Sequence, residues 1–276
     1  MADGSKIEWT DATFNPWVGC TKVSPACDHC YAESWAKRAG NPELWHGERR
    51  RTAASNWRQP VKWNRQATGE RKRVFCASLA DVFDNEVPAE WRRDLFDLIG
   101  ETPHLTWQLL TKRIGNVEKM LPGDWGDGWP NVWIGSTVVN QEEADRDAPK
   151  LLATPAAVRF VSAEPLLGPI DFTNINNLLD WIIAGGESGP GARPMHPDWV
   201  RSIRDQCAAA GVPFFFKQWG EWAPAARQDG HPILNARGYA LPSKTFGMPT
   251  PTRVVRVGKK AAGATLDGRE HKAFPA

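Results

Sequence analysis

The sequence predicts an α/β protein built on about six to seven parallel strands, arranged as a full or partial (β/α) barrel. From residue 73 onward, short β-rich runs alternate with stretches of helical spacing, and this alternation is typical of right-handed βαβ units and a parallel sheet. The strand-like runs are apolar along their length, as strands buried on both faces are. Every run but the first ends in polar or small residues, which in a barrel gather at one rim. An open doubly wound sheet is the alternative.

The expected elements follow one another along the chain. A first, less regular strand lies near Ile7 to Phe14, and six further strands are expected over 73–78, 104–110, 131–138, 157–162, 179–184 and 212–217. Helical spacing is found between them over 89–99, 114–120, 141–152 and 197–210. Pro88 introduces the first of these helices, as prolines often do. About seven strands are close to a full or partial barrel.

Two segments lie outside the alternation. The barrel domain is expected over 1–222 and carries an insertion at 40–72 that is rich in Arg, Trp and Pro. Basic residues interleaved with tryptophan suit a phosphate backbone and stacked bases, and a solvated connector is the alternative. The extension 223–276 is rich in Pro, Gly, Ala and charge, so little regular structure is expected there beyond a short hairpin around 252–257.

Composition excludes some classes of protein. The 276 residues carry a net charge of only +2, which gives no general argument for nucleic-acid binding, so any basic surface must be local. No run approaches the roughly 20 apolar residues of a membrane span, and the first residues lack the pattern of a secretory signal. Five cysteines, three of them clustered, form no disulfide framework, and a reducing, cytoplasmic location is expected.

The three clustered cysteines are the most informative feature of the chain. Cys20, Cys27 and Cys30 have the spacing Cys-x6-Cys-x2-Cys. Three thiolates without a fourth cysteine nearby suit a [4Fe-4S] cluster with one open iron. A zinc site that takes His29 or His46 as its fourth ligand and three unconnected thiols are the alternatives. Cys76 and Cys207 lie in apolar contexts and are expected to be buried core thiols.

An open iron can be chelated by the amino and carboxylate groups of S-adenosyl-L-methionine. In a barrel this cofactor would lie at the carboxyl ends of the strands, where glycines let a ligand approach the backbone. The expected cofactor-binding residues are therefore Ser136, Ser162, Glu164, Gly185, Gly186 and Glu187. The cations at the same strand ends are expected to contact a phosphate-bearing substrate; they are Lys112, Arg113 and Lys217. Alternatively, these cations pair with Glu164 and Glu187 and only fix the shape of the rim.

Several motifs resemble those of the three-Cys-motif, radical-SAM-like family of phages and prophages, long described as a domain of unknown function. The first covers 7–33 and includes the three cysteines. The others are Leu110-Thr-Lys-Arg113, 162–169, 185–189 with 192–194, 216–220, and 257–263 with 266–268. The resemblance covers nearly the whole chain. It implies a cluster at the three cysteines and a partial barrel, and it does not supply a substrate.

These observations favour a radical enzyme that modifies or repairs a nucleic acid or nucleotide. The open-iron spacing, the polar strand ends and the Arg/Trp segment all support it, and such chemistry needs an electron donor as a partner. A zinc- or cluster-stabilised nucleic-acid-binding module without catalysis is one alternative. A redox or sensor protein whose cluster only transfers an electron is the other.

Overall fold

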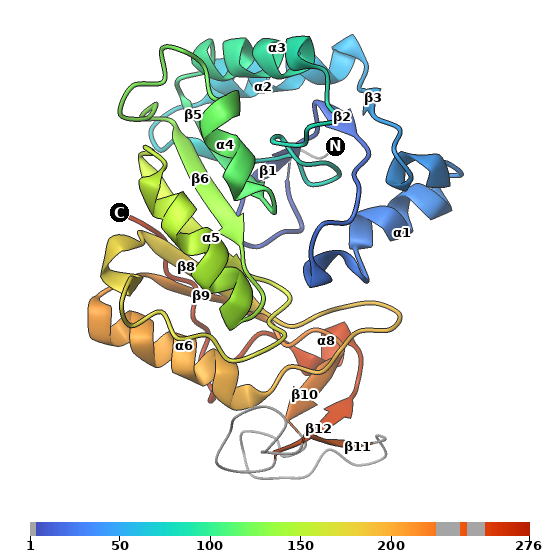
Figure 1. Cartoon of the computed structure of the whole chain (residues 1–276), viewed down its shortest axis with the longest axis vertical. Helices are drawn as coiled ribbons and strands as arrows, with labels where there is room; N and C mark the ends of the chain where they lie inside the picture. The colour runs from blue at the N-terminus through green and yellow to red at the C-terminus, as the bar shows by residue number, and fades with distance from the viewer. Residues whose placement is uncertain (1–3, 225–237, 242–251) are drawn as a thin grey trace. The chain divides into compact units, whose positions relative to one another are not determined.

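A computed structural model describes residues 4–224, 238–241 and 252–276 of the chain (Figure 1). Seven strands form one sheet in the order β1-β4-β5-β6-β7-β8-β9. Neighbours β1/β4, β4/β5, β5/β6, β7/β8 and β8/β9 all pair in parallel. The strands are β1 (Ala12–Phe14), β4 (Lys72–Cys76), β5 (Leu105–Thr111), β6 (Val132–Thr137), β7 (Val158–Ala163), β8 (Trp181–Gly185) and β9 (Phe214–Gln218).

This strand order decides between the two expected architectures. The strands of the sheet follow one another in space in the order in which they occur in the chain. A doubly wound sheet reverses its order at a switch point, and no reversal occurs among these seven strands. The prediction of a partial (β/α) barrel with about six to seven parallel strands is therefore confirmed. All seven strands lie within the expected ranges or within one or two residues of them.

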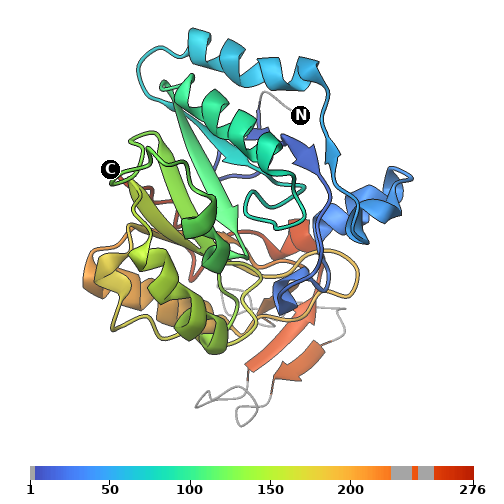
Figure 2. The same cartoon turned by 45° about the horizontal axis from the view of Figure 1, so that its top comes forward.

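The chain divides into two compact units, the first of which comprises residues 1–136 and 149–159. Its strands are buried, with Trp107 of β5 packed edge-on against Phe14 of β1 at 5.7 Å between ring centroids. Its helices are α1 (Tyr31–Arg38), α2 (Ala54–Gln66), α3 (Ala89–Gly100) and α4 (Ile114–Met120). Figures 1 and 2 show α2 and α3 side by side.

The Arg/Trp-rich segment 40–72 contains more regular structure than a connector. After the short 3-10 helix η2 (Pro42–Trp45), strand β3 (Arg50–Arg51) pairs antiparallel with β2 (Trp17–Val18). The 13-residue helix α2 then follows. Pro60 lies inside this helix, and because proline removes a helical hydrogen bond it conceals the helix in the sequence.

The second unit comprises residues 137–148 and 160–276. Helix α5 (Gln141–Ala153) begins in it, and α6 (Pro197–Ala210) lies at the predicted position and ends at Gly211 in the left-handed conformation. A 3-10 turn, η3 (Asn176–Leu178), precedes β8. Among the described residues of this unit, the core contains Trp181, whose ring lies 5.2 Å from that of Phe274.

The C-terminal extension carries a small second sheet. Strand β12 (Thr252–Arg256), at the place of the expected hairpin, pairs antiparallel with both β10 (Trp222–Pro224) and β11 (Gly238–Leu241) (Figure 2). The short helix α8 (Lys259–Ala262) follows. The last residues then return to β9, where Phe216 donates its backbone N–H to the carbonyl of His271 at 2.8 Å. No helix in the described ranges has the length and apolar character needed to cross a membrane.

Candidate functional site: a cysteine loop held by buried ion pairs

The backbone around Cys20 is fixed by three close contacts. Gly19 has φ +111, a conformation that favours glycine, and a Cβ at this position would collide with the carbonyl oxygen of Glu48. The Gly19 N–H donates to the carbonyl of Leu79 at 3.1 Å, and the Cys20 N–H donates to that of Leu44 at 2.9 Å. The first cysteine of the motif is therefore held by segments from both sides of the loop.

The other two cysteines are placed by helical turns. Cys27 ends the 3-10 turn η1 (Pro25–Cys27), which Ser24 caps by accepting the Ala26 N–H at 3.1 Å. Cys30 stands at the N-cap of α1 and makes no side-chain capping bond. Cys27 is buried, whereas Cys20 and Cys30 are half-buried. None of the five cysteines, all of which lie in the described ranges, forms a disulfide.

Two of the three thiols share an apolar wall. Cys20 and Cys30 both pack against one cluster of buried side chains, which consists of Val18, Ala32, Ala36, Leu44 and Trp45. The donor set itself suits an iron–sulfur cluster, because thiolates in a water-poor loop are its ligands. Within the part of the chain that the structure describes, no three Cys, His, Asp or Glu side chains already converge to hold a metal ion. His29 and His46, the candidate zinc ligands, are both exposed.

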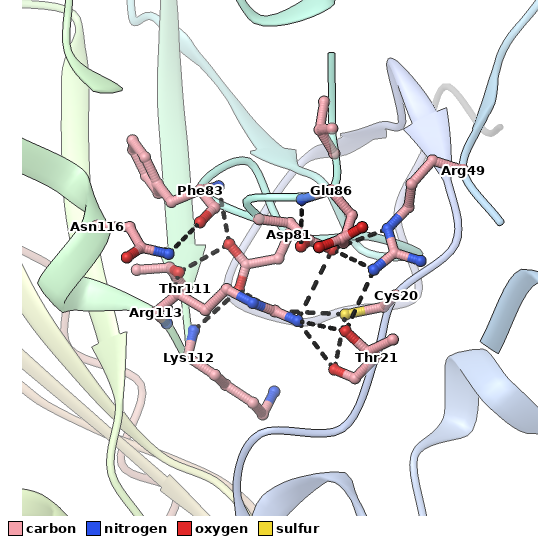
Figure 3. A network of polar contacts seen from close by, with 12 residues as sticks. Cys20, Thr21, Arg49, Asp81, Phe83, Glu86, Thr111, Lys112, Arg113 and Asn116 are labelled. Carbon is pink, nitrogen blue, oxygen red and sulfur yellow. Dashed lines mark hydrogen bonds and ion pairs between the residues drawn. The ribbon is translucent and has the colours of Figure 1, made fainter. Parts of the chain in front are cut away.

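Arg113 is the residue that connects Cys20 to the strand ends (Figure 3). Its Nη1 lies 3.5 Å from Cys20 Sγ and 3.2 Å from Asp81 Oδ2. Its Nη2 donates to the carbonyl of Thr21 at 2.9 Å and to the hydroxyl of the same residue at 3.2 Å. The guanidinium thus contacts the cysteine loop on one side and the Asp81 carboxylate on the other, and the Arg113 side chain is only 8% exposed.

Asp81 orients this arginine from the end of the neighbouring strand. Its carboxylate accepts the Thr111 hydroxyl at 2.7 Å and the Lys112 N–H at 3.1 Å, in addition to Arg113. Both Thr111 and Asp81 are buried. The carboxylate therefore ties the loop after β4 to the end of β5 and holds the guanidinium against the cysteine loop.

A second buried pair, Arg49 with Asp84, supports the first. Arg49 Nε and Nη2 contact Asp84 Oδ2 at 2.8 and 2.6 Å, and both side chains are 2% exposed. Arg49 Nη2 also donates to the Thr21 hydroxyl at 3.2 Å, and Arg113 Nη2 lies 3.7 Å from Asp84. Two arginines and two aspartates therefore form one network around Thr21, directly after the first cysteine. Figure 3 labels Arg49, Asp81 and Arg113 of this network.

The ionisation of the site reflects burial and this network together. Burial raises the pKa of the Cys20 thiol, and the nearby positive charge of Arg113 opposes that rise. Burial alone would lower the pKa of Arg113, but the charge of Asp81, with Cys20 and Asp84, raises it on balance. The guanidinium is therefore a permanent cation beside the thiol, placed where a thiolate needs a counter-charge.

The strand ends of the first unit hold two more of the predicted residues, Ser136 and Lys112. Ser136 of β6 is buried, and its hydroxyl has no hydrogen-bond partner in the described structure. The Lys112 ammonium has no ion pair among the described residues, whereas Arg113 is bound by the aspartates. The expected partners of Arg113, Glu164 and Glu187, are replaced by Asp81 and Asp84.

In the second unit, Glu164, directly after β7, forms an ion pair with Lys217 near the end of β9. Lys217 Nζ lies 2.9 Å from Glu164 Oε1. The Ser162 hydroxyl donates to the other oxygen of the same carboxylate at 3.2 Å. The structure thus brings Ser162, Glu164 and Lys217 together, and the pairing of Lys217 is the one that the rim-shaping alternative expects.

Close backbone packing accounts for the glycines after β8. A Cβ on Gly185 would lie 2.9 Å from Glu164 Oε1, and one on Gly186 would collide with the carbonyl oxygen of Trp219. Glu187 is buried and is bound by Arg193, whose Nη2, Nε and backbone N donate to its carboxylate at 2.6, 2.9 and 2.7 Å. Close packing and the contacts with Arg193 therefore account for these three residues within the second unit.

Sequence reasoning did not find two of the network residues, Thr21 and Asp84, and assigned Arg49 only to the basic segment. Arg49 and Asp84 are 35 residues apart in the chain, and Cys20 and Arg113 are 93 apart. No local pattern signals such pairs. The closeness of Asp81 and Asp84 in the sequence is a hint, because carboxylates that become buried are paired with cations.

The fold and the site define the class of protein. It is a parallel α/β protein with a three-cysteine loop beside the ends of strands β4 and β5. The chain belongs to the family described as "Protein of unknown function (DUF5131)", whose model matches residues 4–275. No curated protein matches it.

Solved structures of spore photoproduct lyase are similar in chain trace. One, complexed with dinucleoside spore photoproduct, is 12% identical over 92% of this chain and 71% of its own, with a TM-score of 0.46. A double mutant with bound AdoMet and the same dinucleoside is 11% identical over 92% and 70%, with a TM-score of 0.45. A tyrosine-to-phenylalanine mutant is 12% identical over 92% and 71%, with a TM-score of 0.47.

Proposed function

We propose that Cys20, Cys27 and Cys30 hold one [4Fe-4S] cluster and that this chain is a radical S-adenosylmethionine enzyme acting on a nucleic acid or nucleotide. The observation that carries the proposal is the pairing of the three-cysteine loop with a buried arginine, Arg113, at 3.5 Å from Cys20 Sγ. Held by these three thiolates, the cluster together with S-adenosylmethionine would supply the one-electron chemistry that cleaves a carbon–sulfur bond and gives a 5'-deoxyadenosyl radical, the electron coming from an external donor.

The residues around the loop would serve such a group in three ways. Arg113 offsets the negative charge of the thiolates and donates a hydrogen bond to the Cys20 sulfur. The apolar cluster against Cys20 and Cys30 keeps water from that side of the site. Asp81 and Asp84 hold the arginine in place, so that its charge needs no reorganisation.

The remaining predicted residues enter as part of the same proposal. Lys112, whose ammonium has no ion pair among the described residues, is the candidate for a substrate phosphate in the first unit. In the second unit, Glu164 and Lys217 already neutralise each other, so their contact with a ligand would require that the ion pair be exchanged. An electron donor is needed as a partner.

Iron and sulfide analysis after anaerobic purification tests the cluster. We expect a brown protein with a broad absorption band, and loss of iron in Cys20→Ala, Cys27→Ala and Cys30→Ala. Cys76→Ala and Cys207→Ala serve as matched controls, because both thiols are buried in the core and should leave the iron content unchanged. A colourless protein that contains zinc would instead support a structural metal site, and full iron retention in Cys27→Ala would refute the ligand assignment.

The reaction class has a separate test. Reduced, reconstituted protein incubated with S-adenosylmethionine should form 5'-deoxyadenosine, and the Cys30→Ala variant should not. If the reconstituted protein neither binds nor cleaves the cofactor while it keeps its iron, the cluster serves electron transfer or stability, and the radical mechanism is wrong for this chain.

A further inference from the structure

Helix α2 presents a cationic face that the cysteine site does not use. Arg58, Lys62 and Arg65 are exposed and spaced by four and three residues, so they lie on one side of the helix. With Ser55, Gln59, Val61 and Gln66 they line a shallow hollow of about 630 Å³. The sequence of α2 contains no acidic residue. The face therefore concentrates positive charge in a chain whose net charge is only +2.

The three cations differ from the arginines that precede the helix. Arg51 pairs with Asp94 at 2.6 Å, and Arg50 donates to the side chain of Asn41 at 3.0 Å. The side chains of Arg58, Lys62 and Arg65 form no ion pair or hydrogen bond within the described ranges. Exposed cations at i, i+4 and i+7 repel one another unless an anion lies across them, so their grouping points to an anionic partner.

The opposite face of α2 is fixed to the body of the first unit. Asn56 donates to the carbonyl of Asn15 at 2.9 Å, and Asn64 accepts the N–H of His104 at 2.8 Å. The two contacts hold the helix at both ends. The cationic face is thus rigid and held outward, which lowers the entropic cost of binding.

The tryptophans of α2 are already occupied. Trp63 is buried, with the Lys72 ammonium 5.3 Å from its ring, and Trp57 is half-buried, with the Arg51 guanidinium 4.3 Å from its ring. Neither ring is therefore a platform for an unpaired base, which single-strand binding uses. The expectation that tryptophans of this segment stack bases does not fit their placement, whereas contacts to a phosphate backbone remain open.

We propose that the face of α2 formed by Arg58, Lys62 and Arg65 binds the phosphate backbone of duplex DNA. The seven helical steps from Arg58 to Arg65 rise about 10 Å along the helix, and the three steps between four successive phosphates of one DNA strand rise a similar distance along the duplex axis, at about 3.4 Å each. The major groove of B-form DNA admits an α-helix, whereas the deep, narrow major groove of A-form RNA does not. The proposal deepens the proposed function, because it names the polymer and the surface that would receive it.

The test compares two triple variants of the full chain with the same loss of charge. The first is Arg58→Gln/Lys62→Gln/Arg65→Gln. The control, Lys119→Gln/Lys259→Gln/Lys260→Gln, removes three exposed lysines elsewhere, and each variant shifts the net charge from +2 to −1. Anisotropy of a fluorescent 20-base-pair DNA duplex is measured against salt, with a matched RNA duplex and a DNA single strand as competitors.

Wild type and control should bind the DNA duplex alike. Each phosphate contact contributes about 0.9 to the slope of log affinity against log salt, so the α2 variant should have a slope shallower by about 2.7. That difference corresponds to roughly 40-fold less loss of affinity between 50 and 200 mM salt. Equal slopes for the two variants, no binding by wild type, or preference for RNA or for the single strand would each overturn the proposal.

Iron content and the thermal midpoint, measured on the same preparations, separate this inference from the cluster. DNA binding that depends on α2 in a protein without iron would refute the proposed function and leave the inference standing. A protein that contains the cluster but whose DNA binding does not depend on α2 would refute this inference and leave the proposed function standing. An unchanged thermal midpoint in both variants shows that the exposed substitutions leave the fold intact.

Discussion

Removing the charge of Asp84 should destabilise the first unit strongly, because this carboxylate is buried between two arginines. Its carboxylate accepts Arg49 Nε at 2.8 Å and the Glu86 N–H at 3.1 Å, and it lies 3.7 Å from Arg113. Asp84→Asn keeps the shape and leaves two buried guanidinium groups with less negative charge around them. Breaking a buried ion pair from one side costs about 3–5 kcal/mol.

Urea unfolding measures this cost. With a slope of about 3 kcal/mol per molar urea, the midpoint of Asp84→Asn should fall by roughly 1–1.7 M. Asp94→Asn is the matched control, because its pair with Arg51 is formed by side chains that are 47% and 35% exposed. Such pairs contribute about 0–1 kcal/mol. If the two variants unfold at the same urea concentration, the buried network does not hold the cysteine loop.

Two further predictions concern titration. The hydrogen bond from Arg201 lowers the pKa of Asp267 although burial opposes it, so the ionised Asp267 stabilises the fold above about pH 4 and this stabilisation is lost as the pH falls through the lowered pKa. The melting temperatures of wild type and Asp267→Asn should therefore differ at pH 7 and converge in acid. A difference that stays constant with pH would contradict this. Burial raises the pKa of Cys207 to about 12 and raises that of Cys76 as well. At pH 8 a disulfide reagent should modify neither in the native protein and both in urea, and more than three reactive thiols before unfolding would speak against their burial.

The strands were predictable because their signal is local. The run from Leu105 to Thr111 consists mostly of large apolar residues and threonine, and all but one of its residues are buried in the structure. Sequential pairing of such runs is the commonest connection in α/β proteins, so the order of the sheet followed as well. Helix α6 was equally clear, with Pro197 at its start and Gly211 after its end.

The missed features depend on residues far apart in the chain. Strand β10 pairs with β12 about thirty residues later. The two strands are not joined by a short turn, so the sequence contains no turn motif that predicts their pairing. The cysteine spacing indicated a loop that binds a metal. The contact of Arg113 with Cys20, and the support that Asp84 gives to Arg113, form only when β4 and β5 lie side by side. Ion pairs of this kind depend on which strands are neighbours in the sheet, and a single sequence contains no local pattern that reveals them.

The last prediction distinguishes two explanations for the glycine at position 186, namely room for a cofactor and close packing of the backbone. Gly186 was expected to let a cofactor approach the backbone, yet the space of its missing Cβ is taken by the carbonyl oxygen of Trp219. Gly186→Ala should therefore lower stability by about 1–3 kcal/mol or more, as overpacking against a backbone does, in protein without any ligand. Thermal unfolding of the variant measures the loss. Gly189→Ala is a useful comparison, since its Cβ would meet no atom within 4 Å and only its φ of +97 resists substitution. A Gly186→Ala protein that melts with the wild type but no longer binds S-adenosylmethionine would assign the glycine to the ligand, because the packing explanation requires the loss to appear before any ligand is added.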